Sequence, residues 1–225
     1  MTVGIKYKLE TNVRVLIACE SSGIVRDAFI KLGHDAMSCD LLETESPGPH
    51  YKGDIRDILD VHHGYVPKFD LMIAHPTCTR LCNSGVRWLH KPPKSKTLDQ
   101  IWQEFKIGVD FYKLFQNANS IPLRAIENPI MHRYAIEKIK PIKRQIVQPW
   151  WFGDEAFKAT GFELIGLPEL IPTNKLLPPK PGSEDHKKWS AIHRASPSPD
   201  RWKQRSKTFQ GMADAMALQW GSVKC

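Results

Sequence analysis

Cys78 is the residue of this sequence with the clearest potential for covalent chemistry. It follows Pro76 by two places, at the end of the apolar run at residues 69–75, so we expect it in a loop. A thiol held in a loop near basic groups can lose its proton and act as a nucleophile. A cysteine taken alone is more often a small buried hydrophobe. A second residue that could act together with the thiol would favour the catalytic interpretation over the structural one.

Glu127 is the candidate partner. It closes the apolar run at residues 122–126 and precedes Asn128 and Pro129. A carboxylate in this position donates a proton or hydrogen-bonds a ligand, or it caps a turn with Asn128. A nucleophilic thiol and a carboxylic acid on neighbouring strand ends suit addition to an electron-poor ring. The acid would then neutralise the ring nitrogen beside the attacked carbon.

The elements that must position these residues alternate between strands and helices. Apolar runs at residues 13–19, 34–40, 69–75 and 122–127 are typical of buried strands, and residues 24–33 and 98–117 are typical of helices. This alternation predicts an α/β fold, with a doubly wound parallel sheet in a three-layer sandwich. Ligands of such sheets bind at the carboxyl ends of the strands. The four strands end at or just before Glu20, Asp40, Cys78 and Glu127.

The remainder of the chain is less regular. Residues 166–205 are rich in Pro, Lys and Ser, and we expect an extended surface segment there, while residues 208–221 regain helical character. The length of 225 residues suits one domain spanning residues 1–225.

Composition limits the class of protein and its partners. The net charge of +8 and the pI near 9.2 favour a polyanionic partner. Basic residues gather in two groups, each of which could also be only a solvated face. The first consists of Lys138, Lys140, Lys143 and Arg144, and the second of Lys187, Lys188, Arg194, Arg201, Lys203, Arg205 and Lys207.

Other features exclude some classes. The five cysteines form no CxxC pair, and Cys78 with Cys82 would need two more ligands, so we expect no metal. No stretch is long and apolar enough to span a bilayer, and the N-terminus has no apolar run. We therefore expect a cytoplasmic protein, as a monomer or weak dimer.

Several motifs together resemble the catalytic domain of the cytosine carbon-5 DNA methyltransferases, in particular the short phage and prophage forms. The run AHPTCTRLCNSG resembles the family's Pro-Cys loop, and ENP at residues 127–129 resembles the motif whose glutamate contacts the cytosine edge. The resemblance extends from about residue 13 to residue 164, with a further piece near the C-terminus. It implies a Rossmann-like fold that uses S-adenosylmethionine, in the cytoplasm of a bacterium or a phage-infected host cell.

The resemblance also implies a role for each matching residue. Cys78 would be the nucleophile, assisted by Glu127 and Lys158. The cofactor would be bound by Glu20, Ser21, Gly23, Asp40, Asp54, Ile55 and Pro76. The substrate would be contacted by Asn128, Pro129, Thr160 and Trp151, which could stack on a base or simply belong to the core.

The sequence departs from the family pattern in three places. Thr77 stands where a proline usually precedes the cysteine, and Lys158 and Thr160 stand in place of arginines. Residues 166–205 stand where the family inserts a larger target-recognition domain. We therefore expect relaxed sequence specificity on duplex or single-stranded DNA. The alternatives are an enzyme that modifies pyrimidine nucleotides, and an inactive nucleic-acid-binding protein on the same fold.

Overall fold

The computed structural model describes residues 12–60, 68–194 and 205–223. Its centre is a seven-stranded sheet in the order β3-β2-β1-β4-β5-β7-β6. Strands β1 to β5 pair in parallel, and β7 runs antiparallel to both of its neighbours. The strands are β1 (Arg14–Ala18), β2 (Asp35–Asp40), β3 (His50–Lys52), β4 (Leu71–Ala74), β5 (Leu123–Asn128), β6 (Arg144–Val147) and β7 (Thr160–Ile165).

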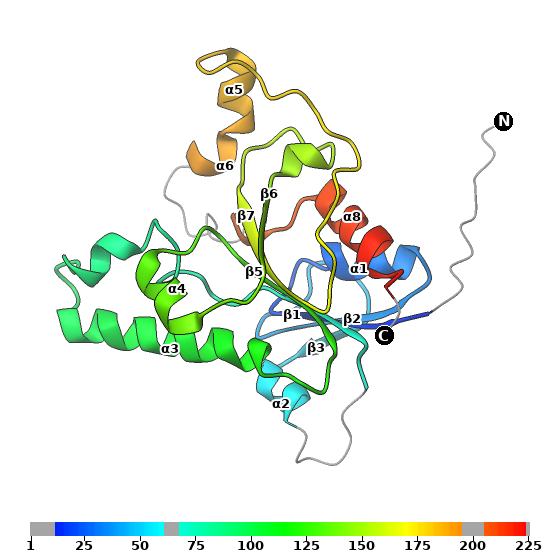
Figure 1. Cartoon of the computed structure of the whole chain (residues 1–225), viewed down its shortest axis with the longest axis horizontal. Helices are drawn as coiled ribbons and strands as arrows, with labels where there is room; N and C mark the ends of the chain where they lie inside the picture. The colour runs from blue at the N-terminus through cyan, green and yellow to red at the C-terminus, as the bar shows by residue number, and fades with distance from the viewer. Residues whose placement is uncertain (1–11, 61–67, 195–204, 224–225) are drawn as a thin grey trace.

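Helices cover both faces of this sheet (Figure 1). Helices α1 (Ile24–Lys31) and α8 (Gln210–Trp220) pack together on one face. The other face carries α2 (Ile55–Leu59), α3 (Leu98–Gln116) and α4 (Arg133–Ile139). The predicted fold class, a doubly wound, Rossmann-like three-layer sandwich, is confirmed.

The strands bury side chains on both faces, which is why their sequences are continuous apolar runs. In β1, Val15 and Ile17 enter the core beneath α1 and α8, whereas Leu16 and Ala18 enter the core beneath α3. The predicted helix at residues 98–117 is confirmed as α3. Thr97 begins it with a capping box that includes Gln100. None of the described helices is long and apolar enough to cross a membrane.

Residues 166–205 differ from the expected extended surface segment. Leu167 and Leu170 are buried in the core, and Trp220 Nε1 donates to the Pro168 carbonyl at 3.0 Å. Farther along, α5 (Glu184–Trp189) and α6 (Ala191–Arg194) form a small lobe that projects beyond β6 and β7 (Figure 1). Ser183 caps α5, a local signal that the irregular composition concealed. Residues 195–204, with Arg201 and Lys203, lie outside the described residues.

Candidate active site

The register of the sheet brings three loops to one edge. Strands β4 and β5 are parallel neighbours with Ala74 opposite Ile126, so the loop carrying Cys78 leaves beside Glu127. Strand β7 is antiparallel to β5 and places Gly161 opposite Asn128, so β7 begins where β5 ends. A Cβ atom at Gly161 would lie 2.8 Å from the Asn128 carbonyl oxygen, so this close approach requires glycine.

Glu127, Lys158 and Thr160 consequently line one small cavity. The rest of its lining comes from β7 and from the start of α8, namely Phe162, Thr208, Phe209 and Met212. Lys158 Nζ donates to the Lys207 carbonyl at 2.8 Å. Lys207 in turn forms an ion pair with Glu45 in the loop after β2. The segment before α8 therefore connects this cavity to the loop after β2, at the part of the sheet edge formed by the ends of β1, β2 and β3.

Cys78 lies in a single helical turn after β4. Its carbonyl accepts hydrogen bonds from Leu81 N at 2.9 Å and from Cys82 N at 3.1 Å. This turn places the Cys78 and Cys82 thiols on the same side, four residues apart. Cys82 Sγ lies 3.0 Å from Ser84 Oγ, at hydrogen-bond distance.

The neighbouring Cys78 thiol and the Ser84 hydroxyl lower the pKa of Cys82 against the opposing effect of burial. The neighbouring Cys82, burial and the charge of Glu127 raise the pKa of Cys78.

Glu127 is largely buried and faces His75, whose Nδ1 lies 3.5 Å from Glu127 Oε2. Within the described parts of the chain, His75 Nε2 and both polar side-chain atoms of Asn128 are buried without a hydrogen-bond partner. Buried polar groups in folded proteins usually have partners. These unsatisfied atoms at the ends of β4 and β5 are therefore suited to a polar ligand.

Lys158 adds a basic group to this cluster. Burial lowers its pKa, and the charges of Glu127 and Cys78 oppose that shift. The structure thus brings together Cys78, Glu127, Lys158 and Thr160, with Asn128 adjacent. Pro76 is buried and Pro129 is half-buried, and both lie in the loops that leave β4 and β5.

The other half of the sheet edge contains the residues expected to bind the cofactor. Burial, and then the charges of Asp40 and Asp54, raise the pKa of Cys19 at the end of β1, so both carboxylates lie close to this thiol. Asp40 Oδ1 accepts from Leu42 N at 2.9 Å, and Asp54 caps α2 through Arg56 N at 2.9 Å. Ile55 is buried beside them.

These carboxylates suit S-adenosylmethionine, because ribose hydroxyls and an adenine amino group are hydrogen-bond donors and ionised carboxylates are acceptors. Asp40 and Asp54 would hold this part of the cofactor. Their convergence on the end of β1 is the observation that supports the fit.

Glu20, Ser21 and Gly23 form the turn between β1 and α1. The Glu20 carboxylate is buried and accepts from Val25 N and from Ser22 Oγ, both at 2.9 Å. It therefore satisfies the N-terminus of α1, which has no side-chain cap from Gly23. Gly23 has φ of 76°, a conformation that favours glycine. The Ser21 carbonyl accepts from Glu45 N at 2.8 Å.

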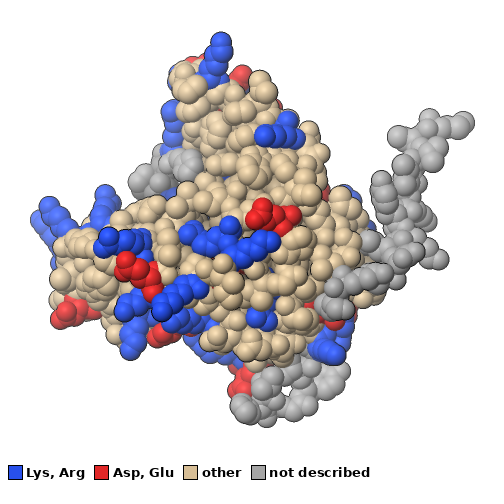
Figure 2. Space-filling model, in the orientation of Figure 1, with Lys and Arg blue, Asp and Glu red and all other residues tan. Residues whose placement is uncertain are grey.

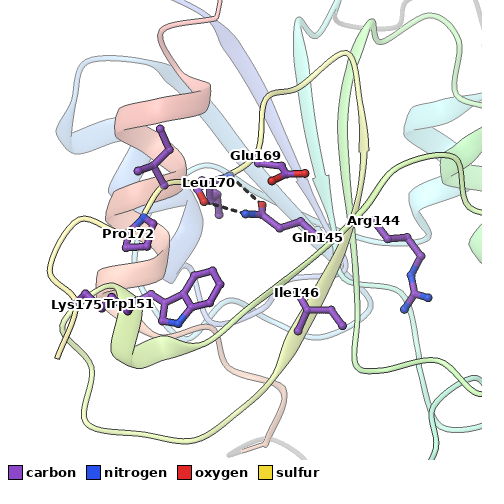
Figure 3. A pocket seen from close by; sticks show the side chains of 9 residues that line it. Arg144, Gln145, Ile146, Trp151, Glu169, Leu170, Pro172 and Lys175 are labelled. Carbon is purple, nitrogen blue, oxygen red and sulfur yellow. Dashed lines mark hydrogen bonds between the residues drawn. The ribbon is translucent and has the colours of Figure 1, made fainter. Parts of the chain in front are cut away.

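Trp151 lies elsewhere. It packs against the core and lines a surface pocket of about 490 Å³ with Arg144, Ile146 and Lys175 (Figure 3). Gln145 closes the floor of this pocket through two 2.8 Å hydrogen bonds to Leu170. Trp151 is not among the residues that line the cavity at Glu127, so stacking on a base stays a prediction.

Sequence reasoning missed two parts of the site. Cys82 was interpreted only as half of an incomplete metal pair, although a spacing of four residues also fits one helical turn. No sequence pattern indicated a role in the site for residues 207–209, because that role depends on where α8 packs. Among the described residues, no group of three or more His, Cys, Asp or Glu side chains is arranged to hold a metal.

Comparisons with known proteins give similarities only at the level of structure. No protein-family model and no curated protein matches the sequence. A prophage-encoded E. coli protein assigned to the DNA modification methyltransferases is 12% identical with a TM-score of 0.47, over 74% of this chain and 53% of that chain. The Entamoeba histolytica methyltransferase EhMeth is 15% identical with a TM-score of 0.47, over 74% of this chain and 58% of that chain.

A third similar structure is a type I restriction-modification methyltransferase subunit from Streptococcus thermophilus. It is 11% identical with a TM-score of 0.34, over 86% of this chain and 49% of that chain. This chain thus spans only about half the length of these proteins. At such identities, a proposal for the substrate must come from the site itself.

Proposed function

We propose that this protein transfers a methyl group from S-adenosylmethionine to carbon-5 of cytosine in DNA. The observation that carries the proposal is the convergence of Cys78, Glu127 and Lys158 at the ends of β4 and β5 and the start of β7. The motifs that resemble the cytosine carbon-5 methyltransferases contribute these same residues. S-adenosylmethionine, when bound, supplies an electrophilic methyl group.

The residues of this chain have separable tasks in the reaction. Cys78 Sγ forms a bond to carbon-6 of the ring, and the electron pair of the C5–C6 double bond shifts towards carbon-5. Glu127 hydrogen-bonds or protonates the ring nitrogen and orients the exocyclic amine, which favours this shift. The positive charge of protonated Lys158 stabilises the Glu127 carboxylate and the thiolate beside it. Once carbon-5 has bonded to the methyl group, a water molecule takes the carbon-5 proton, the electron pair of that C–H bond re-forms the C5–C6 double bond, and the C6–S bond breaks with its electron pair returning to Cys78.

The unsatisfied groups at the ends of β4 and β5 support a base as the ligand. Asn128 and His75 Nε2 are buried without partners among the residues that the structure describes. A flipped cytosine would present a polar edge to them. Asn128, Pro129 and Thr160 would then border the base, as the resemblance implies.

The surface supports a polyanionic substrate. Lys138, Lys140, Lys143 and Arg144 follow α4 into β6, and Figure 2 shows Lys and Arg side chains gathered over this part of the molecule. Within the described chain, none of these four forms an ion pair with a carboxylate, whereas Lys187 and Lys188 pair with Glu184 and Asp185 on α5. The first basic group is therefore the better candidate to contact phosphates.

The small lobe formed by α5 and α6 suggests limited base reading. Sequence-specific recognition needs side chains that reach base edges in a groove. The described part of residues 166–205 contains the short helices α5 and α6, where the family inserts a larger domain. We therefore propose short or relaxed sequence specificity.

The test is methyl transfer from labelled S-adenosylmethionine to duplex DNA, single-stranded DNA and deoxycytidine monophosphate, with mass spectrometry of the nucleosides. We expect 5-methylcytosine in DNA with the wild-type protein, none with Cys78→Ala, and nearly wild-type transfer with Cys39→Ala, a buried thiol in β2. Label confined to the monophosphate would make the protein a nucleotide-modifying enzyme. Label on adenine or on the cytosine amine would contradict the thiol mechanism, and DNA binding without label would indicate an inactive binding protein.

A further inference from the structure

Glu45 lies in the loop between β2 and β3, and this loop is held against α1. The fully buried side chain of Arg26 in α1 donates to the Ser46 carbonyl at 2.9 Å and to Thr44 Oγ1 at 3.1 Å. The backbone N–H of Glu45 donates to the Ser21 carbonyl at 2.8 Å. The backbone of Glu45 and of both its neighbours is therefore fixed relative to the turn between β1 and α1.

The Glu45 carboxylate connects this loop to the segment that leads into α8. It forms an ion pair with Lys207, which lies 162 residues later in the chain. The backbone carbonyl of Lys207 accepts a hydrogen bond from Lys158 Nζ at 2.8 Å. The next two residues, Thr208 and Phe209, line the same cavity as Lys158. The ion pair therefore anchors the carbonyl group that holds the Lys158 ammonium group at this cavity.

Lys158 depends on such an anchor, because a lysine side chain is long and flexible. The charges of Glu127 at the end of β5 and of Cys78 after β4 favour its protonated form, and the charge of Arg205 before α8 disfavours it. His75 in turn faces Glu127. These charges act over a distance and set no direction for the ammonium group. A hydrogen bond to a fixed carbonyl does set one, because its strength depends on geometry.

We infer that Glu45 and Lys207 are positioning residues, whose ion pair directs the Lys158 ammonium group towards Glu127 and Cys78. This inference rests on the proposed function, in which Lys158 stabilises the negative charges beside the base. Both partners of the ion pair are partly exposed, with 42% of the Lys207 side chain and 37% of the Glu45 side chain accessible. An ion pair of this kind contributes little, so we expect its removal to change the reaction by about three- to fivefold.

The test is an NMR titration of the Lys158 ammonium group in protein with isotope-labelled lysine, without DNA or cofactor, with Lys158→Met to assign the signal. Glu45→Gln should lower the pKa of Lys158 by about half a pH unit, which corresponds to a three- to fivefold change, because the ammonium group loses its fixed acceptor. Lys207→Gln should lower this pKa as well. Removal of a positive charge would by itself raise the pKa of Lys158, so a fall in both variants identifies lost positioning.

Glu43→Gln is the matched control. Glu43 lies in the same loop and pairs with Lys52 at 2.7 Å, so its variant removes the same charge and should leave the pKa of Lys158 unchanged. The double variant Glu45→Lys with Lys207→Glu re-forms the ion pair with its charges exchanged, and should restore the wild-type pKa. Three results would overturn the inference: opposite shifts in Glu45→Gln and Lys207→Gln, equal shifts in Glu43→Gln and Glu45→Gln, or no recovery in the double variant.

Methyl transfer provides a second, separate measurement. Glu45→Gln should slow single-turnover transfer about three- to fivefold and leave the KM for S-adenosylmethionine unchanged, because its backbone bond to Ser21 is kept. A raised KM with an unchanged rate would overturn the inference and make Glu45 a residue of the cofactor site. The expected pKa shifts without any wild-type transfer would remove the proposed function and leave the positioning of Lys158 intact. Wild-type transfer by Glu45→Gln with an unshifted pKa of Lys158 would remove the positioning and leave the proposed function intact.

Discussion

The polar groups at the carboxyl edge of the sheet differ in their hydrogen-bond partners between the two halves of that edge. At the ends of β1, β2 and β3, each predicted carboxylate hydrogen-bonds a nearby backbone N–H: Glu20 bonds Val25, Asp40 bonds Leu42, and Asp54 bonds Arg56. At the ends of β4 and β5, the Asn128 side chain and His75 Nε2 find no partner among the described residues.

This difference shows which half of the sheet edge depends on its polar side chains for folding. The first half uses carboxylates to close turns and to begin helices, so the same groups contribute to stability and to the proposed cofactor site. The second half is held by strand register and by the backbone pairing of the Cys82 turn with Met131. Its side chains are left available for a ligand. Substitutions should therefore lower stability in the first half and activity in the second.

The largest effect is expected for Glu127→Gln. Loss of the acid should slow methyl transfer about 10²- to 10⁴-fold, which is the usual contribution of general acid–base catalysis. The free energy of unfolding should change by less than about 0.5 kcal/mol, because the amide has nearly the same shape. Single-turnover kinetics and urea unfolding measure the two quantities. A variant that unfolds readily but still transfers at the wild-type rate would reverse the comparison.

A smaller loss is expected for Lys158→Met, which removes the charge and retains most of the side-chain length. Transfer should slow about tenfold, equivalent to roughly 1.4 kcal/mol of lost transition-state stabilisation. Stability at pH 7 should be unchanged or higher by about 1 kcal/mol, because a buried cation is replaced by an apolar group.

The stability of Lys158→Met should also depend on pH in a defined direction. Burial lowers the pKa of Lys158 in the folded chain below its usual value of 10.5, which the unfolded chain keeps. At pH values between the folded and the unfolded pKa, the unfolded chain therefore binds more protons than the folded chain. Wild-type stability therefore gains from this group as the pH rises through that window. Any advantage of the variant should shrink towards pH 10.5, as urea unfolding at several pH values would reveal. An advantage that grows with pH would contradict this assignment.

A stability effect is expected in the first half for Glu20→Ala. The backbone N–H of Val25 and the Ser22 hydroxyl would lose their acceptor, which should lower the free energy of unfolding by about 1–3 kcal/mol. Glu20→Gln serves as the control, since its amide oxygen can still accept, and it should lose less. Equal unfolding free energies for wild type and Glu20→Ala would show that this carboxylate does not close the turn.

The smallest effect is expected for Asp54→Asn. Asparagine is also a good N-cap, so α2 should keep its start and stability should be nearly unchanged. The KM for S-adenosylmethionine should rise about three- to tenfold, because a neutral amide oxygen is a weaker acceptor than a carboxylate. Isothermal titration of the cofactor measures the same change independently. Unaltered cofactor affinity would remove Asp54 from the proposed cofactor site.

The regular part of the fold was predictable because its strands and helices carry local signals. The apolar runs that became β1, β2, β4 and β5 are buried on both faces, and α3 has both a helical repeat and a cap. Strands β6 and β7 were not predicted, since they contain charged residues such as Arg144 and Glu163. The buried carboxylate of Glu163 is satisfied by Gln116 in α3, a contact 47 residues away in sequence.

The sequence by itself determined that polar residues follow the ends of several buried strands, because apolar content and turn residues are local properties. Only the tertiary structure decided which of those ends are neighbours. The antiparallel placement of β7 beside β5 brings Lys158 to Glu127. The backbone pairing of Cys82 with Met131 ties the turn that carries Cys78 to the segment after β5. Both depend on hydrogen bonds between residues distant in sequence, which no local pattern of residue types specifies.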